Sequence, residues 1–209
     1  MDFRFAYKSA VAVFTDLVYR VPAGHWYGPG LGHWTLRKLV GHTVGSGLRE
    51  VSTKLTSPGS TVTVASAADY WGYARTAPPE MVAAAVAASD EDARVTGEGL
   101  GAEPAAAVAG FAREAAQALA AAGDADVVTT AIGGMRVRDW IPTRTFELVV
   151  HGLDVAAAVE VPVEFAAEVV AEVTAQAARV AAGGEDGTLV LRALTGRGGL
   201  PAGYSVIGT

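Results

Sequence analysis

Residues 146–156 read FELVVHGLDVA, a short apolar segment that carries Glu147, His151 and Asp154. Residues three or four apart lie on the same face of a helix, so these side chains form one stripe, which Arg144 extends toward the N-terminus. The residues beside the stripe are Phe, Leu and Val, and a helix that is apolar on most sides is usually buried. The segment therefore predicts a buried helix with one polar stripe.

The spacing within this stripe suits a metal site. The β-carbons of Glu147 and His151, four residues apart, lie about 5–6 Å from each other on a helix. From that separation both side chains can reach one ion with bonds of about 2 Å. The same spacing also describes the solvent face of an ordinary amphipathic helix, so two interpretations stay open. The pattern differs from HExxH, so a zincin protease is not indicated.

A third metal ligand would have to come from another helix. His42 is the best candidate because it lies in KLVGHTVGSG, residues 38–47, where small residues would leave room for an ion and a substrate. Its alternative interpretation is a hydrogen-bonded histidine of the core. His25 and His33 lie in a loop rich in glycine and proline and are expected at the surface or at a pocket rim. One glutamate and two histidines would leave a fourth position for water or substrate, as in catalytic metal sites.

The rest of the chain reads as mostly helical. Apolar periodicity and helix-ending residues predict helices over 3–21, 36–55, 80–96, 105–122, about 142–159 and 163–184. The expected fold class is all-α, with about four principal helices suited to a bundle. Gly41, Gly45 and Gly47 lower helix propensity, and we expect a neighbouring segment or a ligand to approach closely there.

The composition excludes several kinds of function. The 209 residues are 51% hydrophobic and carry a net charge of -6, which argues against a general nucleic-acid binder. There is no cysteine, so any thiol chemistry would need a thiol from outside. We expect a cytoplasmic protein, because no segment has the pattern of a signal peptide or a membrane span. We also expect it to be a monomer or a homodimer.

Three blocks of sequence resemble a known family. LGHWTLRKLVGHT (31–43), GGMRVRDWIPTRTFELVVHGLDVA (133–156) and LVLRALTGRG (189–198) are similar to the mycothiol-dependent maleylpyruvate isomerase family, within the DinB and YfiT-like metal proteins. The resemblance implies a four-helix bundle that holds a divalent metal, usually zinc, through His42, Glu147 and His151. It implies a bundle domain over 1–185, with 186–209 as a short C-terminal segment packed on it or extending it.

The resemblance also implies a function. The metal would bind mycothiol or a related thiol, and the thiolate would attack a small electrophilic substrate, giving either thiol transfer or isomerisation. Asp154 would orient a metal-bound histidine by contacting the ring nitrogen that does not face the metal, or would simply lie on an exposed helix face. An aromatic and cationic set could hold an anionic substrate or the thiol: Trp34, Tyr70, Trp71 and Arg144.

The chain departs from the family pattern in two respects. His33 stands where an acidic residue is common, and the isomerase proper has a further C-terminal domain that helps to form the substrate site. Two alternatives therefore stay open beside the thiol-dependent enzyme. They are a hydrolase that uses metal-bound water and a helical bundle that binds partners without catalysis.

Overall fold

The computed structural model describes residues 1–57, 59 and 61–207 of the chain and is predominantly helical, as predicted. The helices are α1 (Phe3–Tyr19), the 3-10 turn η1 (Ala23–His25), α2 (Leu36–Val44), the π-helical turn η2 (Gly45–Arg49), α3 (Glu50–Leu55), α4 (Ala67–Thr76), α5 (Pro79–Gly99), α6 (Pro104–Ala121), α7 (Val137–Val159), α8 (Ala167–Gly183) and α9 (Gly187–Leu194). The predicted helix over 36–55 is thus continuous, with a π-turn at its centre.

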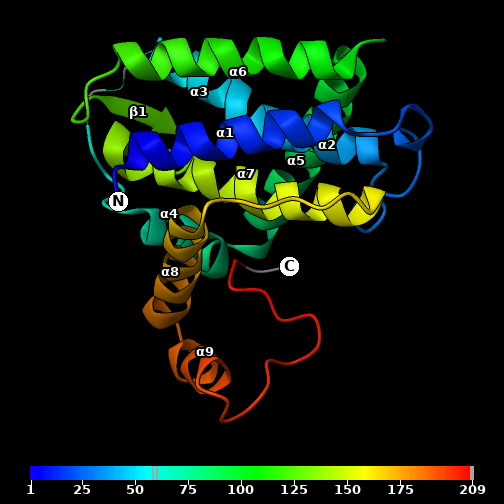
Figure 1. Cartoon of the computed structure of the whole chain (residues 1–209). Coiled ribbons are helices and arrows are strands. Elements are labelled where there is room, and N and C mark those ends of the chain that lie inside the picture. The colour runs from blue at the N-terminus through cyan, green and yellow to red at the C-terminus, as the bar shows by residue number, and fades with distance from the viewer. Residues whose placement is uncertain (58, 60, 208–209) are drawn as a thin grey trace.

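The bundle is built around α7. Helix α1 packs on α7 and α6, α2 packs on α5 and α7, and α3 packs on α6 (Figure 1). Apolar side chains of these helices fill one core, and the largest of those that are fully buried include Phe14, Leu39, Leu119, Trp140 and Leu148. This core fixes α2 and α7 side by side, the two helices that carry the candidate metal ligands.

The close approach expected at the glycines of α2 is present. A β-carbon at position 41 would lie 2.4 Å from the carbonyl oxygen of Ala93 and 2.5 Å from the backbone nitrogen of Gly97, both on α5. Glycine at position 41 therefore lets the backbones of α2 and α5 touch.

Helix α7 begins earlier than the sequence predicts. It starts at Val137, directly after the hairpin of β1 (Val127–Thr130) and β2 (Gly133–Arg136), and Pro142 lies inside it. The carbonyl oxygens of Asp126 and Asp124 accept hydrogen bonds from the first two N–H groups of α7, at 2.8 and 3.2 Å. The turn before the hairpin thereby caps the helix, which no local residue pattern reveals.

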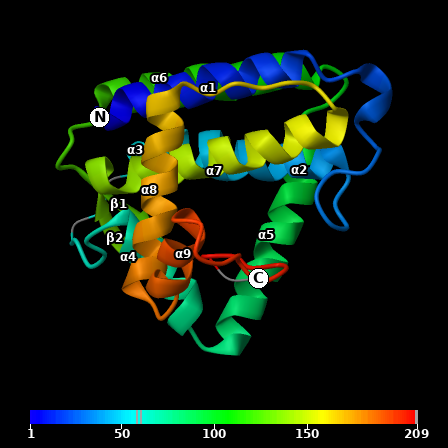
Figure 2. The ribbon, with the colours of Figure 1, turned by 60° about the horizontal axis from the view of Figure 1, so that its bottom comes forward.

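Helices α4, α8 and α9 form a second layer, which lies below the bundle in Figure 1. Helix α8 packs mainly on α4, and α9 packs on α8 (Figure 2). Arg75 of α4 forms an ion pair with Asp186 and donates a hydrogen bond to the carbonyl oxygen of Val206 at 3.1 Å, which ties the C-terminal segment to α4. Neither α4 nor α9 was predicted as a helix. Helix α8 starts later than predicted, at Ala167, because the chain after Pro162 is extended.

None of the helices in the described part of the chain combines the length and the apolar character needed to cross a membrane.

Candidate metal centre

The polar stripe of α7 faces α2 rather than solvent. Glu147 is buried, with a side chain 10% exposed, and His151 follows it one turn later with a side chain 18% exposed. The solvent side of α7 is instead marked by Leu153, which is 50% exposed. Of the two interpretations of the stripe, the structure therefore supports the inward-facing one.

Three side chains meet between α2 and α7. Oε2 of Glu147 lies 3.3 Å from Nε2 of His42 and 3.4 Å from Nε2 of His151. The two imidazole rings are 4.8 Å apart at 87°. One atom from each of the three residues can be chosen so that all lie within 4.8 Å of one another, a group that could hold a metal ion. The distances of 3.3 and 3.4 Å from the carboxylate oxygen to the two Nε2 atoms are close to the separation of about 3.3 Å between ligands of a tetrahedral ion with bonds of about 2 Å.

The far nitrogen of each ring is already engaged. Nδ1 of His151 lies 3.0 Å from Oδ2 of Asp154, and Nδ1 of His42 lies 3.3 Å from Oγ of Ser89 on α5. Such partners fix the orientation of a histidine and leave its other nitrogen free. Both Nε2 atoms consequently point at Glu147, and the donor set of two imidazoles and a carboxylate fits zinc or a similar divalent ion.

The electrostatics favour a cation at this point. Burial lowers the pKa of His151, but hydrogen bonds to Asp154 and Glu147 outweigh that effect and raise the pKa to about 9. Burial alone would raise the pKa of Glu147, yet His151, His42 and Arg144 bring it well below its usual range. The metal-free site thus holds an ionised carboxylate beside a protonated imidazole, and a metal ion would replace that proton.

Arg144 lies one turn before Glu147 but does not reach the surface. It is 2% exposed, and its Nη1 donates to Oε2 of Glu50 at 2.8 Å and to the carbonyl oxygen of Ser46 at 3.2 Å. Burial lowers the pKa of Arg144, but Tyr70, Glu147 and Glu50 outweigh that effect and raise the pKa above its usual value. Its positive charge therefore acts on the site from within the core.

The predicted aromatic residues fall into two groups. Tyr70 and Trp71 of α4 lie over the guanidinium of Arg144, with ring centroids 5.3 and 5.9 Å from its Cζ atom. Trp34 lies instead beside His42, with the two ring centroids 5.1 Å apart. The structure thus brings Tyr70 and Trp71 to Arg144, and Trp34 to the metal candidates.

The remaining histidines lie outside the cluster. His25 is exposed in η1, and His33 is exposed with its Nε2 3.2 Å from Oδ1 of Asp90. Asp90 also accepts hydrogen bonds from Lys38 and from Nε1 of Trp34, and these donors, the lysine first, lower the pKa of Asp90 to about 2. His33 therefore lies at the surface, one of the two places that the sequence predicts for it, and contacts Asp90 there.

Two residues that contact the candidate ligands are not predicted from the sequence. The Ser46 hydroxyl lies 3.0 Å from Oε2 of Glu147, and Ser89 contacts His42 from α5. The spacing could have indicated Ser46, since it stands four residues after His42 and shares its helix face. Ser89 has no such signal, because an isolated serine in an alanine-rich helix has no pattern that singles it out.

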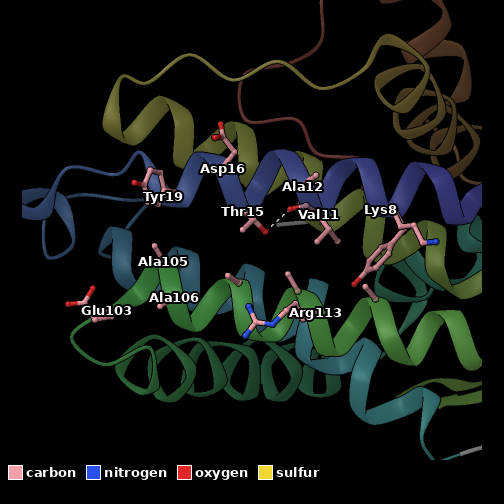
Figure 3. A pocket seen from close by; sticks show the side chains of 14 residues that line it. Lys8, Val11, Ala12, Thr15, Asp16, Tyr19, Glu103, Ala105, Ala106 and Arg113 are labelled. Carbon is pink, nitrogen blue, oxygen red and sulfur yellow. Dashed lines mark hydrogen bonds between the residues drawn. The ribbon is translucent and has the colours of Figure 1, made fainter.

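An open groove lies elsewhere, between α1 and α6, with a volume of about 830 Å³ (Figure 3). Val11, Ala12 and Thr15 line it from α1, and Ala105, Ala106 and Arg113 line it from α6. It shares no residue with the three candidate ligands and offers mainly small apolar side chains.

The fold and the cluster together define a class: a helical bundle with a two-histidine, one-glutamate centre that could hold a divalent metal. Residues 8–156, more than half of the chain, match the family described as the mycothiol maleylpyruvate isomerase N-terminal domain. The chain belongs to that family. No curated protein and no solved structure gave a significant match.

Proposed function

We propose that this protein is a cytoplasmic, metal-dependent enzyme that uses mycothiol or a related small thiol to modify or isomerise a small electrophilic substrate. The observation that carries the proposal is the convergence of Nε2 of His42 and Nε2 of His151 on the buried carboxylate of Glu147. Membership of the mycothiol-related family supports the choice of thiol.

Three protein ligands suit a catalytic metal better than a structural one. Structural zinc sites usually have four protein ligands, whereas catalytic sites keep one position open. We propose Zn²⁺ held by His42, Glu147 and His151. When bound, a divalent ion lowers the pKa of a coordinated thiol and so supplies thiolate at neutral pH.

The residues behind the ligands have separate roles in the proposal. Asp154 holds Nδ1 of His151, and Ser89 holds Nδ1 of His42, so each ring presents Nε2 to the ion. Trp34, whose ring packs against His42, is the aromatic side chain beside the ligands that we expect substrate to touch. Arg144 contributes buried positive charge, and Tyr70 and Trp71 cover it.

The chemistry needs a thiol from outside, because the chain has no cysteine. The thiolate sulfur attacks an electrophilic carbon of a double bond conjugated to a carbonyl group. The carbon–sulfur bond forms as the π bond breaks, and its electron pair moves to the carbonyl oxygen. In a transfer the carbon–sulfur bond persists, the neighbouring carbon takes up the proton that the thiol released, and the thiol is consumed. In an isomerisation the bond breaks again after rotation about the former double bond, and the thiol is regenerated.

Elemental analysis combined with calorimetry tests the proposal. Purified protein should contain a divalent metal, and mycothiol should bind more tightly than bacillithiol or glutathione to the metal-loaded protein. His151→Ala should lose both the metal and thiol binding, while His25→Ala, an exposed histidine outside the cluster, should keep both. The proposal fails if His151→Ala retains metal and thiol at the level of the unaltered protein.

The same three ligands could also present water to a substrate, which would make the protein a hydrolase. Turnover assays with and without thiol separate the two activities, since a hydrolase works without thiol. Metal binding without thiol binding or turnover would instead indicate a non-catalytic bundle.

A further inference from the structure

The helix that carries His42 contains a π-turn close to the candidate metal centre. The backbone N–H of Glu50 donates to the carbonyl oxygen of Gly45, five residues earlier, within the π-helical segment Gly45–Arg49. A π-turn adds one residue to the helical register and leaves the normal hydrogen-bond ladder interrupted, and such turns are frequent at functional sites. This one begins three residues after His42.

Two buried side chains from other helices hold the π-turn. Oη of Tyr7, on α1, donates to the carbonyl oxygen of Gly47 at 2.7 Å, and Nη1 of Arg144, on α7, donates to that of Ser46 at 3.2 Å. Tyr7 is 1% exposed and Arg144 is 2% exposed, so neither bond is open to competition from bulk water. The two donors thus hold adjacent carbonyl groups of the turn, those of Gly47 and Ser46.

The π-turn in turn fixes the distance between the two ligand-bearing helices. The Ser46 hydroxyl lies within hydrogen-bond distance of both the carbonyl oxygen of His42, at 2.9 Å, and Oε2 of Glu147, at 3.0 Å. A β-carbon at position 47 would lie 2.8 Å from Cδ2 of Leu148, so the glycine at this place lets α7 come close. Ser46 of the turn therefore contacts both the backbone of His42 and the carboxylate of Glu147.

We propose that Tyr7 and Arg144 are positioning residues of the metal centre and act through the π-turn η2. By holding the carbonyl groups of Gly47 and Ser46, they set where Ser46 and His42 stand relative to Glu147. This inference rests on the metal site proposed above. A purely structural role would stabilise the fold without affecting how the metal is held.

Cobalt binding to metal-free protein distinguishes the two roles, because the visible absorption of Co²⁺ reports the geometry of its ligands. Tyr7→Phe removes only the hydroxyl, and Tyr19→Phe is the matched control, since Tyr19 lies on the same helix with 79% exposure. Tyr7→Phe should bind Co²⁺ roughly 10-fold or more weakly, as losses of supporting contacts around metal sites generally do, and with a changed spectrum. Tyr19→Phe should match the unaltered protein in both respects.

Arg144→Lys provides a second test that does not depend on the folding of Tyr7→Phe. The lysine keeps the positive charge but cannot reproduce the guanidinium contacts to Ser46 and Glu50, so its Co²⁺ spectrum should also change. Unchanged affinity and spectrum in the folded variants would overturn the positioning role, even if their melting temperatures fell. Failure of the unaltered protein to bind Co²⁺ would overturn the proposed metal site and this inference with it.

Discussion

The contact between α2 and α5 gives a prediction of stability that can be worked from distances. In Gly41→Ala the new β-carbon would lie 2.4 Å from the carbonyl oxygen of Ala93 and 2.5 Å from the nitrogen of Gly97, where ordinary contacts begin at 3.4 Å. The two helices must therefore separate by roughly 1 Å, and overpacking of this kind typically costs about 1–3 kcal/mol. The gain in helix propensity, up to about 1 kcal/mol, offsets only part of the loss.

Because the atoms that clash are all backbone, the cost lies in the upper part of that range, about 2–3 kcal/mol. The net expectation is a loss of about 1–2 kcal/mol, which corresponds to a fall in melting temperature of roughly 2–8 °C for a chain of this length. The matched control is Gly72→Ala in α4, where a β-carbon would meet nothing within 4 Å. Gly72→Ala should raise stability by about 0.4–1 kcal/mol. The two alanine variants should thus shift the melting temperature in opposite directions.

Calorimetry or urea unfolding of metal-free protein measures both effects. Because Ser89 on α5 contacts His42 on α2, Gly41→Ala should also weaken zinc binding, whereas Gly72→Ala should not. A Gly41→Ala protein as stable as the unaltered protein would refute the reasoning, since it would mean that the backbones of α2 and α5 do not touch in solution.

Three further predictions concern the metal centre. Asp154→Asn should weaken zinc binding about 10–100-fold in competition with a chromophoric chelator, while exposed Asp16→Asn should leave it unchanged; equal affinities would remove Asp154 from the site. Because the pKa of His151 is about 9 in metal-free protein, zinc binding at pH 7 should release about one proton, and affinity should fall about tenfold per pH unit below 9. Calorimetry in buffers of different ionisation enthalpy counts that proton, and its absence would contradict the predicted state of His151. Zinc at about 100 times its Kd should stabilise the unaltered protein by about 2.7 kcal/mol, and His42→Ala should lose most of this gain; a retained shift would mean that His42 is not a ligand.

The sequence predicts the long helices well because their signals are local. The helix at the N-terminus ends before Pro22, and α5 and α6 each begin with a proline in the first turn. The start of α7 escapes prediction because its caps are the backbone oxygens of Asp124 and Asp126, which a hairpin brings into place. Helix α4 is not predicted, because its apolar side chains pack against α8, which is distant in the sequence.

The residues of the candidate metal centre also differ in whether local sequence predicts them. Glu147 and His151 can be paired from spacing alone, because both lie on one helix. His42 needs a second block of sequence, and its resemblance to a family, since nothing local says that α2 faces α7. Ser89 and Tyr7 cannot be predicted, because they approach from other helices only after the bundle has formed. Arg144 can be placed on the stripe of α7 from spacing, but its hydrogen bond to the π-turn cannot be predicted.

The strongest physical argument for function is that α7, whose buried residues are mostly apolar, departs from that pattern at two positions. It buries the carboxylate of Glu147 and exposes half of Leu153, although an ordinary helix would do the reverse. Burial of a charge is costly unless it is paired, and here His42, His151 and Arg144 all lower the pKa of Glu147. Local rules are broken mainly where function requires it. A centre that holds an ionised carboxylate between two oriented imidazoles could bind a cation, and a packed core alone gives no reason to keep it.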